Sequence, residues 1–432
     1  MLKNSFMLVL AALLGFSVDS GAAIKAVERD PLEEAETALR ENNPVAALRA
    51  LEAVLAANPD QPAARFWRGR LLASKGEFDR ALADLDAAIR LQPDNADAFA
   101  HRAFIHQKRR QTDDALADLN QALRIDPKNN LSLLLRGLLF ADRGDSRAAL
   151  GDLDAALEAS PENREALLSR AQIHFMRRDF PAALLDFERC IQLSPNDPNG
   201  HIGRGGVHYA TGKFQEAVED YTEAVELLPK SARPLAQRAY AYAALDQDEK
   251  ALADFDAALK LDPKNADARL GRAELHRFKK RWEEALADYD VLLAEPGDYR
   301  AMLGRAAVFH VSGQTEKALA AYAELMERHP GEAQPFNDCA WLLATGEVDR
   351  LRDGRRAVEL ATKACTLSAW GNAGYLDTLA AAYAETGDFA AALKWQEEAA
   401  RIAAEEPAEV QADIKGRIAL YQEKKPHREA LK

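Results

Sequence analysis

The sequence is poor in cysteine, aromatic residues and basic charge, and each shortage excludes a class of protein. Three cysteines among 432 residues cannot form the disulfide framework that holds small secreted domains together. Aromatic residues make up only 7% of the chain and charged residues 29%, a composition that favours long amphipathic helices over a sheet protein. The formal net charge of -13 argues against a nucleic-acid partner, because surfaces that bind DNA or RNA are basic.

Motifs of catalysis and cofactor binding are missing as well. The sequence has no nucleophile motif, no P-loop, no glycine-rich dinucleotide turn and no zinc-ligand spacing. We therefore expect no catalytic, cofactor-binding or metal-binding residues, and we predict that the protein is not an enzyme.

Long apolar runs are confined to the N-terminus. Residues 6–16 (FMLVLAALLGF) follow Lys3 and precede small residues, the pattern of a secretory signal peptide. We expect a signal peptide over residues 1–23, cleavage after Ala22 or Ala23, and a periplasmic or secreted bacterial protein. An uncleaved anchor and a chance first helix are the alternatives. The run is short for a membrane span, and no later segment is apolar enough, so we expect no span in the mature chain.

The prolines reveal an internal repeat. They recur every 34 residues in short polar stretches such as LQPDNAD, where a proline ends one helix and a neighbouring Asp or Asn caps the next. The phased prolines are Pro59, Pro93, Pro127, Pro161, Pro195, Pro229 and Pro263, followed by Pro296, which is one residue early, and Pro330.

Small and large apolar residues keep phase with the prolines. A small residue recurs in the expected first helix of each repeat: Gly69, Ala103, Gly137, Ala171, Gly205, Ala239, Ala273 and Ala306. An alanine recurs in the second helix: Ala81, Ala115, Ala149, Ala183, Ala217, Ala251, Ala285 and Ala318. Four residues later comes a large apolar residue: Leu85, Leu119, Leu153, Phe187, Tyr221, Phe255, Tyr289 and Tyr322. Small residues let two antiparallel helices approach closely, and the large residue fills the space beside them.

This pattern resembles the tetratricopeptide repeat. The resemblance covers residues 28–403 and implies an all-α fold: a right-handed α-α superhelical solenoid of about eleven helix-turn-helix repeats. Residues 404–432 are expected to form a C-terminal capping helix and tail, which the end of a solenoid requires. The repeat between Pro335 and Ser368 carries an insertion, TGEVDRLRDG, between its helices. The segment that follows the insertion also resembles the last repeats of exported bacterial proteins of this family.

Two charged sets share the period. An arginine precedes the small residue of the first helix: Arg68, Arg102, Arg136, Arg170, Arg204, Arg238, Arg272 and Arg305. An aspartate follows the second-helix alanine: Asp84, Asp118, Asp152, Asp186, Asp220, Asp254 and Asp288. A guanidinium can meet a carboxylate with two parallel hydrogen bonds, so we predict a ladder of pairs within repeats, such as Arg136–Asp152. An anion-binding role for the arginines is the alternative.

Histidines and cysteines receive structural interpretations. His106, His174, His208 and His276 share a slot that other repeats fill with Leu72, Phe140, Tyr242 and Phe309, so they are expected to pack as rings. Metal binding, or an enzymatic accessory role that uses these histidines, is the alternative function. Cys190 replaces a core alanine and is expected to be buried. A disulfide between Cys339 and Cys365 remains open.

Function is expected on the inner face of the first helices. Proteins of the tetratricopeptide family bind extended peptides or helices there, so the resemblance implies an exported scaffold or adaptor with a protein or peptide ligand. The positions of that face that we predict to form the groove are Phe66, Arg70, Phe104, Lys108, Leu131, Leu134, Leu138, Leu168, Gln172, Phe175, Ile202, Tyr209, Arg233, Tyr240, Leu270, Arg277, Arg300 and Leu303. Packing of some of these side chains against adjacent repeats is the alternative. Gly203 and Gly206 face the groove or its edge, so that a ligand backbone could approach closely. The alternative is that the glycines make this helix a flexible joint.

Overall fold

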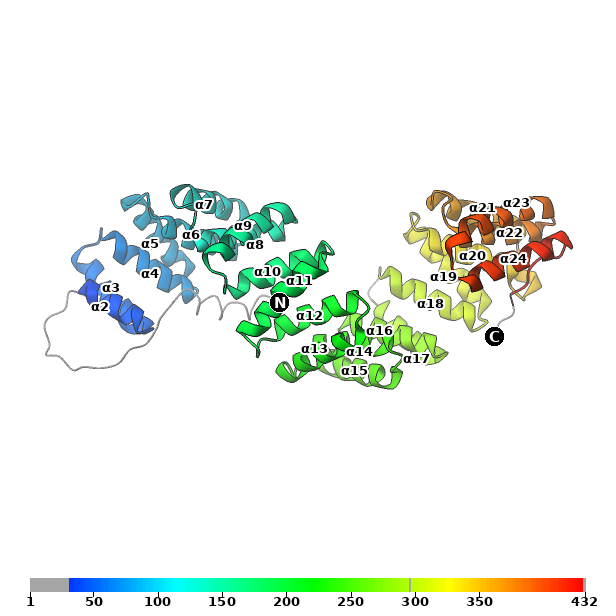
Figure 1. Cartoon of the computed structure of the whole chain (residues 1–432), viewed down its shortest axis with the longest axis horizontal. Coiled ribbons are helices and arrows are strands. Elements are labelled where there is room, and N and C mark those ends of the chain that lie inside the picture. Colours follow the sequence, from blue (N-terminus) through cyan, green and yellow to red (C-terminus); the bar gives the residue numbers. More distant parts are fainter. Residues whose placement is uncertain (1–30, 295–296, 430–432) are drawn as a thin grey trace. The chain divides into compact units, whose positions relative to one another are not determined.

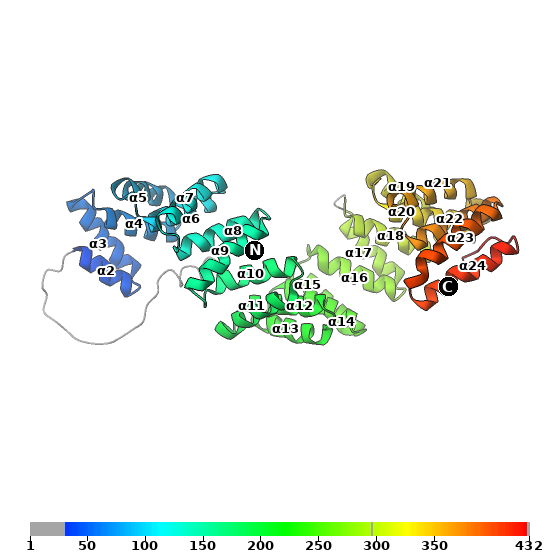
Figure 2. The same ribbon diagram turned by 45° about the horizontal axis from the view of Figure 1, so that its top comes forward.

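The computed structural model describes residues 31–294 and 297–429, and all regular structure in these ranges is helical (Figure 1). The predicted signal peptide, residues 1–23, lies outside the described residues. By their contacts the described residues divide into two units, 31–228 and 229–429. The same motif of two packed consecutive helices is repeated through both units (Figures 1 and 2).

The helices of the first unit are α2 (Pro31–Arg40), α3 (Pro44–Ala57), α4 (Pro62–Ser74), α5 (Phe78–Leu91), α6 (Ala96–Lys108), α7 (Thr112–Ile125), α8 (Asn130–Asp142), α9 (Ser146–Ala159), α10 (Arg164–Met176), α11 (Phe180–Leu193), α12 (Pro198–Ala210) and α13 (Phe214–Leu227). Those of the second unit are α14 (Ala232–Ala244), α15 (Asp248–Leu261), α16 (Ala266–Phe278), α17 (Trp282–Leu292), α18 (Tyr299–Val311), α19 (Thr315–Arg328), α20 (Ala333–Thr345), α21 (Gly354–Leu367), α22 (Ala373–Thr386), α23 (Phe389–Ile402) and α24 (Ala408–Gln422), with 3-10 turns at Asp349–Leu351 and Ala403–Glu405. The all-α repeat fold is therefore confirmed; the handedness of the solenoid stays a prediction.

Capping residues and residues with positive φ delimit the helices of many repeats. Asn95, Asn129 and Asn163 cap first helices by accepting hydrogen bonds from backbone N–H groups in the first turn. The turn between the two helices needs a residue with positive φ, which Gly76 and Gly144 supply with φ of 80° and 79°. Arg110, Arg178, Asp246 and Lys280 take the same left-handed conformation in other repeats.

Small residues hold the paired helices close together. A Cβ added to Gly69 would lie 3.0 Å from Leu85 Cγ, and one added to Gly137 would lie 3.0 Å from Leu153 Cγ. The in-phase alanines Ala81, Ala115 and Ala149 have no exposed surface. The spacing of small and large residues therefore sets the distance between the helices of a pair.

The predicted Arg–Asp ladder is confirmed. In the seven pairs from Arg68–Asp84 to Arg272–Asp288, Nε and Nη2 of the arginine both donate to the aspartate, over distances of 2.6–3.1 Å. The aspartates are buried and the arginines half-buried. Arg305, whose repeat lacks the acid, lies 3.3 Å from Asp290 and 3.8 Å from Glu324.

The ladder also joins neighbouring repeats. The Nη1 atoms of Arg102, Arg170 and Arg272 donate to a carboxylate on the second helix of the preceding repeat. These partners are Asp86, Asp154 and Asp256, at 2.6, 2.7 and 2.5 Å, and Arg136 donates in the same way to Asn120 at 2.8 Å. One guanidinium thus fixes both the helices of its own repeat and the position of the repeat before it.

Three glycines of first helices pack against aromatic rings of the preceding repeat. A Cβ on Gly203 would lie 2.2 Å from the Phe187 ring, one on Gly271 2.4 Å from Phe255, and one on Gly304 2.5 Å from Tyr289. The interpretation of Gly203 as a place for a ligand backbone is therefore wrong, because the Phe187 ring occupies that space. Gly206 lies in a more open place, where the nearest atom to an added Cβ is 3.8 Å away.

The chain closes with α24, which packs on α23 and buries Ile414 and Tyr421. The buried Gln396 of α23 donates to the carbonyl of Ile414 at 2.9 Å, and Arg417 of α24 donates to Asp377 of α22 at 2.9 Å. No helix among the described residues is long and apolar enough to cross a membrane.

The ladder predicts unequal effects for two aspartates of α9. Asp152→Asn should lower the free energy of unfolding by about 2 kcal/mol, because a buried charge-assisted pair loses its charge. Asp154→Asn is the matched control: Asp154 is half-exposed and meets only one arginine nitrogen, so a loss below about 0.5 kcal/mol is expected. Urea unfolding followed by circular dichroism measures both, and equal losses would contradict the ladder's structural role.

The contact between Phe187 and Gly203 predicts that the effect of Gly203→Ala on the free energy of unfolding changes sign when the ring is removed. Gly203→Ala should destabilise the chain by about 2 kcal/mol, because the new methyl group overlaps the Phe187 ring. In a Phe187→Leu background the same change should stabilise by up to about 1 kcal/mol, because alanine favours the helix. A double-mutant cycle in urea tests this, and an identical effect in both backgrounds would show that the contact does not constrain position 203.

Candidate partner-binding surface

The first helices of neighbouring repeats form a layer of their own. In the first unit α4 contacts α6, α6 contacts α8, α8 contacts α10 and α10 contacts α12; in the second unit α14 contacts α16, α16 contacts α18 and α20 contacts α22. Within each unit, a second helix that is followed by another repeat packs between its own first helix and that of the next repeat. The predicted groove residues all lie on first helices, so we call their exposed side the first-helix face.

Four predicted groove positions are core residues. Phe66, Leu134, Ile202 and Leu270 are each at most 7% exposed, because they pack within their own and adjacent repeats. Phe66, for example, lies 5.6 Å, centroid to centroid, from the ring of His101 in the next repeat. These side chains cannot reach a ligand in this structure, as the packing alternative anticipated.

An apolar set remains accessible in the first unit. Leu131, Leu138 and Leu168 are half-buried on α8 and α10, and so are Phe104 and Phe175. Phe175 and Tyr209 each pack against the first residue of their second helix, Phe180 at 5.9 Å and Phe214 at 5.4 Å between ring centroids. Tyr209 stays 37% exposed. These residues give α8, α10 and α12 a partly apolar face.

Polar groove residues lie beside the apolar set. Arg70 stacks on Trp67 with 5.0 Å between its Cζ and the ring centroid, and Lys108 Nζ lies 5.0 Å from the Phe104 centroid. Burial lowers the pKa of the Arg70 guanidinium. Gln172 is exposed on α10.

In the second unit the remaining predicted residues differ in their surroundings. The hydroxyl of Tyr240 donates to the carbonyl of Asp267 at 2.7 Å, and Arg277 donates to Glu274 at 2.6 Å. Leu303 is half-buried against the core of the last repeats. Arg233 and Arg300 are exposed. This part of the face is therefore less apolar than the part on α8 and α10.

The sequence interpretation missed exposed apolar side chains at the ends of first helices. Met176 of α10 is 79% exposed and Phe278 of α16 is 72% exposed. Each is the last residue of a first helix. Because Met176 follows Gln172 by four residues, the two share one side of α10, so Met176 extends the first-helix face.

The in-phase histidines pack beside the ladder. Nε2 of His106 lies 3.7 Å from Asp118, and Nε2 of His208 lies 3.8 Å from Asp220. Burial lowers the pKa of His276, which favours its neutral form. Among residues 31–294 and 297–429, no group of three or more His, Cys, Asp or Glu side chains is arranged to hold a metal ion.

Sequence profiles of the tetratricopeptide repeat match residues 32–96, 68–130, 103–146, 134–198, 198–231, 236–298, 300–331 and 373–406. The matches span well over half of the chain. The chain belongs to the tetratricopeptide repeat family.

Three solved structures are similar to this chain at low sequence identity. A tetratricopeptide repeat protein of Parabacteroides merdae is 19% identical over 57% of this chain and 98% of its own, with a TM-score of 0.45. Yeast Tom70 is 16% identical over 91% of this chain and 95% of its own, with a TM-score of 0.44. YrrB, described as having an unusual peptide-binding site, is 22% identical over 43% of this chain and 95% of its own, with a TM-score of 0.39. The chain has no match among curated protein sequences.

The three thiols are free and buried, so the disulfide left open for Cys339 and Cys365 is not present. Burial raises the pKa of Cys190 and Cys339 to about 12 and that of Cys365 to about 11. A thiolate is the reactive form, so native thiols should be inert at neutral pH.

We therefore expect the native chain to react with Ellman's reagent at least tenfold more slowly than the same chain in 6 M guanidinium chloride, which exposes all three thiols. Absorbance at 412 nm measures both rates. Rapid labelling of one native thiol would identify a cysteine that the fold does not protect.

Proposed function

We propose that this tetratricopeptide repeat protein is an exported scaffold that binds a polypeptide segment on its first-helix face. The observation that carries the proposal is the partly apolar surface of α8 and α10, which adds the 79% exposed Met176 to the half-buried Leu138, Leu168 and Phe175. Apolar side chains that gather on an exposed face favour a partner that covers them.

The chemistry of the face suggests the kind of segment. Its apolar part calls for one or two apolar anchor residues, such as those on one side of a helix or an extended peptide. Arg70 and Lys108 lie on the two preceding first helices and favour an acidic residue in the same segment. The chain as a whole is acidic, with a formal net charge of -13, which disfavours an acidic partner elsewhere on its surface.

Export is the second part of the proposal. It is supported by the apolar run of residues 6–16 behind Lys3 and by the small residues up to Ala23. The partner is then an envelope or secreted polypeptide.

Two substitutions in one repeat test the binding surface. Met176→Asp places a charge on the first-helix face, whereas Leu185→Asp places the same charge on α11, a second helix, at a residue that is 68% exposed. Both sites are exposed, so each change should alter the free energy of unfolding by less than about 0.5 kcal/mol.

Affinity capture from an envelope fraction, quantified by mass spectrometry, should recover a polypeptide partner with the wild-type chain and with Leu185→Asp. Recovery should fall at least tenfold with Met176→Asp. Equal recovery with both variants would remove α10 from the binding surface and contradict the proposal.

A further inference from the structure

The chain's own C-terminal residues cross the first helices of the last repeats. After α24 a turn with Lys424 at a φ of 58° ends the helix, and the N–H of Lys425 returns to the carbonyl of Leu420 at 2.9 Å. Residues 425–429 have no helical structure and reach α20, which lies far earlier in the sequence. The tail thus occupies the kind of surface on which this family is expected to bind other chains.

Glu429 is held by side chains and backbone together. Its carboxylate accepts from Nε1 of Trp341 at 2.7 Å and meets Nε2 of His310 at 3.2 Å. Its N–H donates to the carbonyl of Thr345 at 3.0 Å. Burial alone would raise the pKa of the Glu429 carboxyl, but the contacts with His310 and Trp341 lower it below its usual value. The ionised form of Glu429 is therefore the form that these contacts stabilise.

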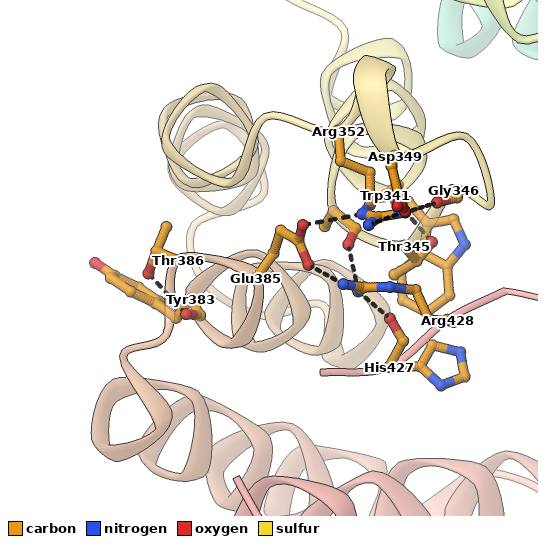
Figure 3. Close-up of polar contacts among 11 residues, drawn as sticks. Trp341, Thr345, Gly346, Asp349, Arg352, Tyr383, Glu385, Thr386, His427 and Arg428 are labelled. Carbon is orange, nitrogen blue, oxygen red and sulfur yellow. Dashed lines mark hydrogen bonds and ion pairs between the residues drawn. The ribbon is translucent and has the colours of Figure 1, made fainter. Parts of the chain in front are cut away.

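Arg428 has a separate acceptor. Its Nη2 lies 2.6 Å from Oε2 of Glu385 at the end of α22, and its Nη1 lies 3.4 Å from the carbonyl of Ala344. The other carboxylate oxygen of Glu385 accepts from Nε of Arg352 in the insertion at 2.9 Å. Figure 3 shows Glu385 between the two arginines, one from the insertion and one from the tail. Since Glu385 is already held by Arg352, its carboxylate is fixed before the tail arrives.

His427 completes the contact. Its ring lies 5.5 Å from that of Trp341, centroid to centroid, and Arg417 of α24 lies 5.1 Å from the same indole. Three successive residues therefore meet an aromatic ring, an acid and a pair of N–H donors. Backbone hydrogen bonding combined with separate side-chain sites is how extended peptides are recognised.

We propose that the surface formed by His310 of α18, Trp341 and Thr345 of α20, and Glu385 of α22 is a binding site for an extended peptide with adjacent basic and acidic residues, and that the chain's own Arg428–Glu429 occupies it. The tail is attached beside the site, at an effective concentration of about millimolar, so contacts that are weak between separate molecules hold it in place. A partner segment with the same two charges competes with the tail. This inference rests on the proposed function and assigns it a second, self-occupied site.

The test uses the full-length chain and a fluorescent peptide with the sequence of the tail, KKPHREALK. Arg428→Ala with Glu429→Ala weakens the tail's hold on the site. The matched control is Glu423→Ala with Lys425→Ala, which removes one acidic and one basic side chain that pair with each other at 2.7 Å. Fluorescence anisotropy should show at least tenfold tighter binding of the peptide to the first variant than to the wild type, and the control should behave as the wild type.

Two further measurements assign the contacts. A peptide with Gln at the place of Glu429 should bind the Arg428→Ala, Glu429→Ala chain at least fivefold more weakly. Trp341→Phe in that chain should have a similar effect, because the ring stays and its N–H donor is lost. Absence of peptide binding to the Arg428→Ala, Glu429→Ala chain, or equal binding to all three chains, would overturn the proposal.

The outcome is separable from that of the proposed function. Partner capture that depends on Met176 concerns the other unit of the chain and does not involve the tail. If Met176→Asp abolishes capture and the tail peptide never binds, the self-occupied site is wrong and the scaffold function stands.

Discussion

The pairing of one arginine with carboxylates from two repeats is the interaction on which the structure depends. Each guanidinium uses two nitrogens for the aspartate of its own repeat, and in Arg102, Arg170 and Arg272 the third reaches back to the second helix of the repeat before. A buried carboxylate without such a partner would be costly, so the aspartate can be buried only where the arginine arrives. This geometry explains the fixed interval between the arginine and the aspartate. The small residues that bring the paired helices together recur with the same period.

The features that recur with the period could be predicted from the sequence. Helix pairs, their turns and the Arg–Asp pairs recur every 34 residues, so each copy supports the interpretation of the others. Which side of a first helix stays accessible was harder to predict, because it depends on how one repeat lies on the next. Phe66 and Leu134 looked like groove residues but pack into the core, whereas Met176 at a helix end is accessible.

Contacts that occur only once could not be predicted from the repeat period. His310 and Glu429 are separated by 119 positions, and residues 31–294 and 297–429 show no second copy of the contact in phase with the repeat. The insertion could be recognised in the sequence. Nothing in the sequence indicated that Arg352 of the insertion and a residue of the tail would both bind Glu385. The one signal available was that residues 424–429 carry three basic side chains, Lys424, Lys425 and Arg428, together with His427.

The rings that enter the next repeat have a consequence for how such a chain can grow. Phe187 requires glycine at position 203, and Phe255 and Tyr289 require it at 271 and 304, whereas the preceding repeats carry Leu153 with Ser169. In each case the ring lies on the second helix of one repeat and the glycine on the first helix of the next repeat. A duplication of α10 and α11 alone would place Phe187 against Ser169 of the copied α10 and not against Gly203. A segment that begins at a second helix and ends at the following first helix keeps the two together. A duplication that preserves these three contacts therefore begins at a second helix, one helix away from the start of each helix pair.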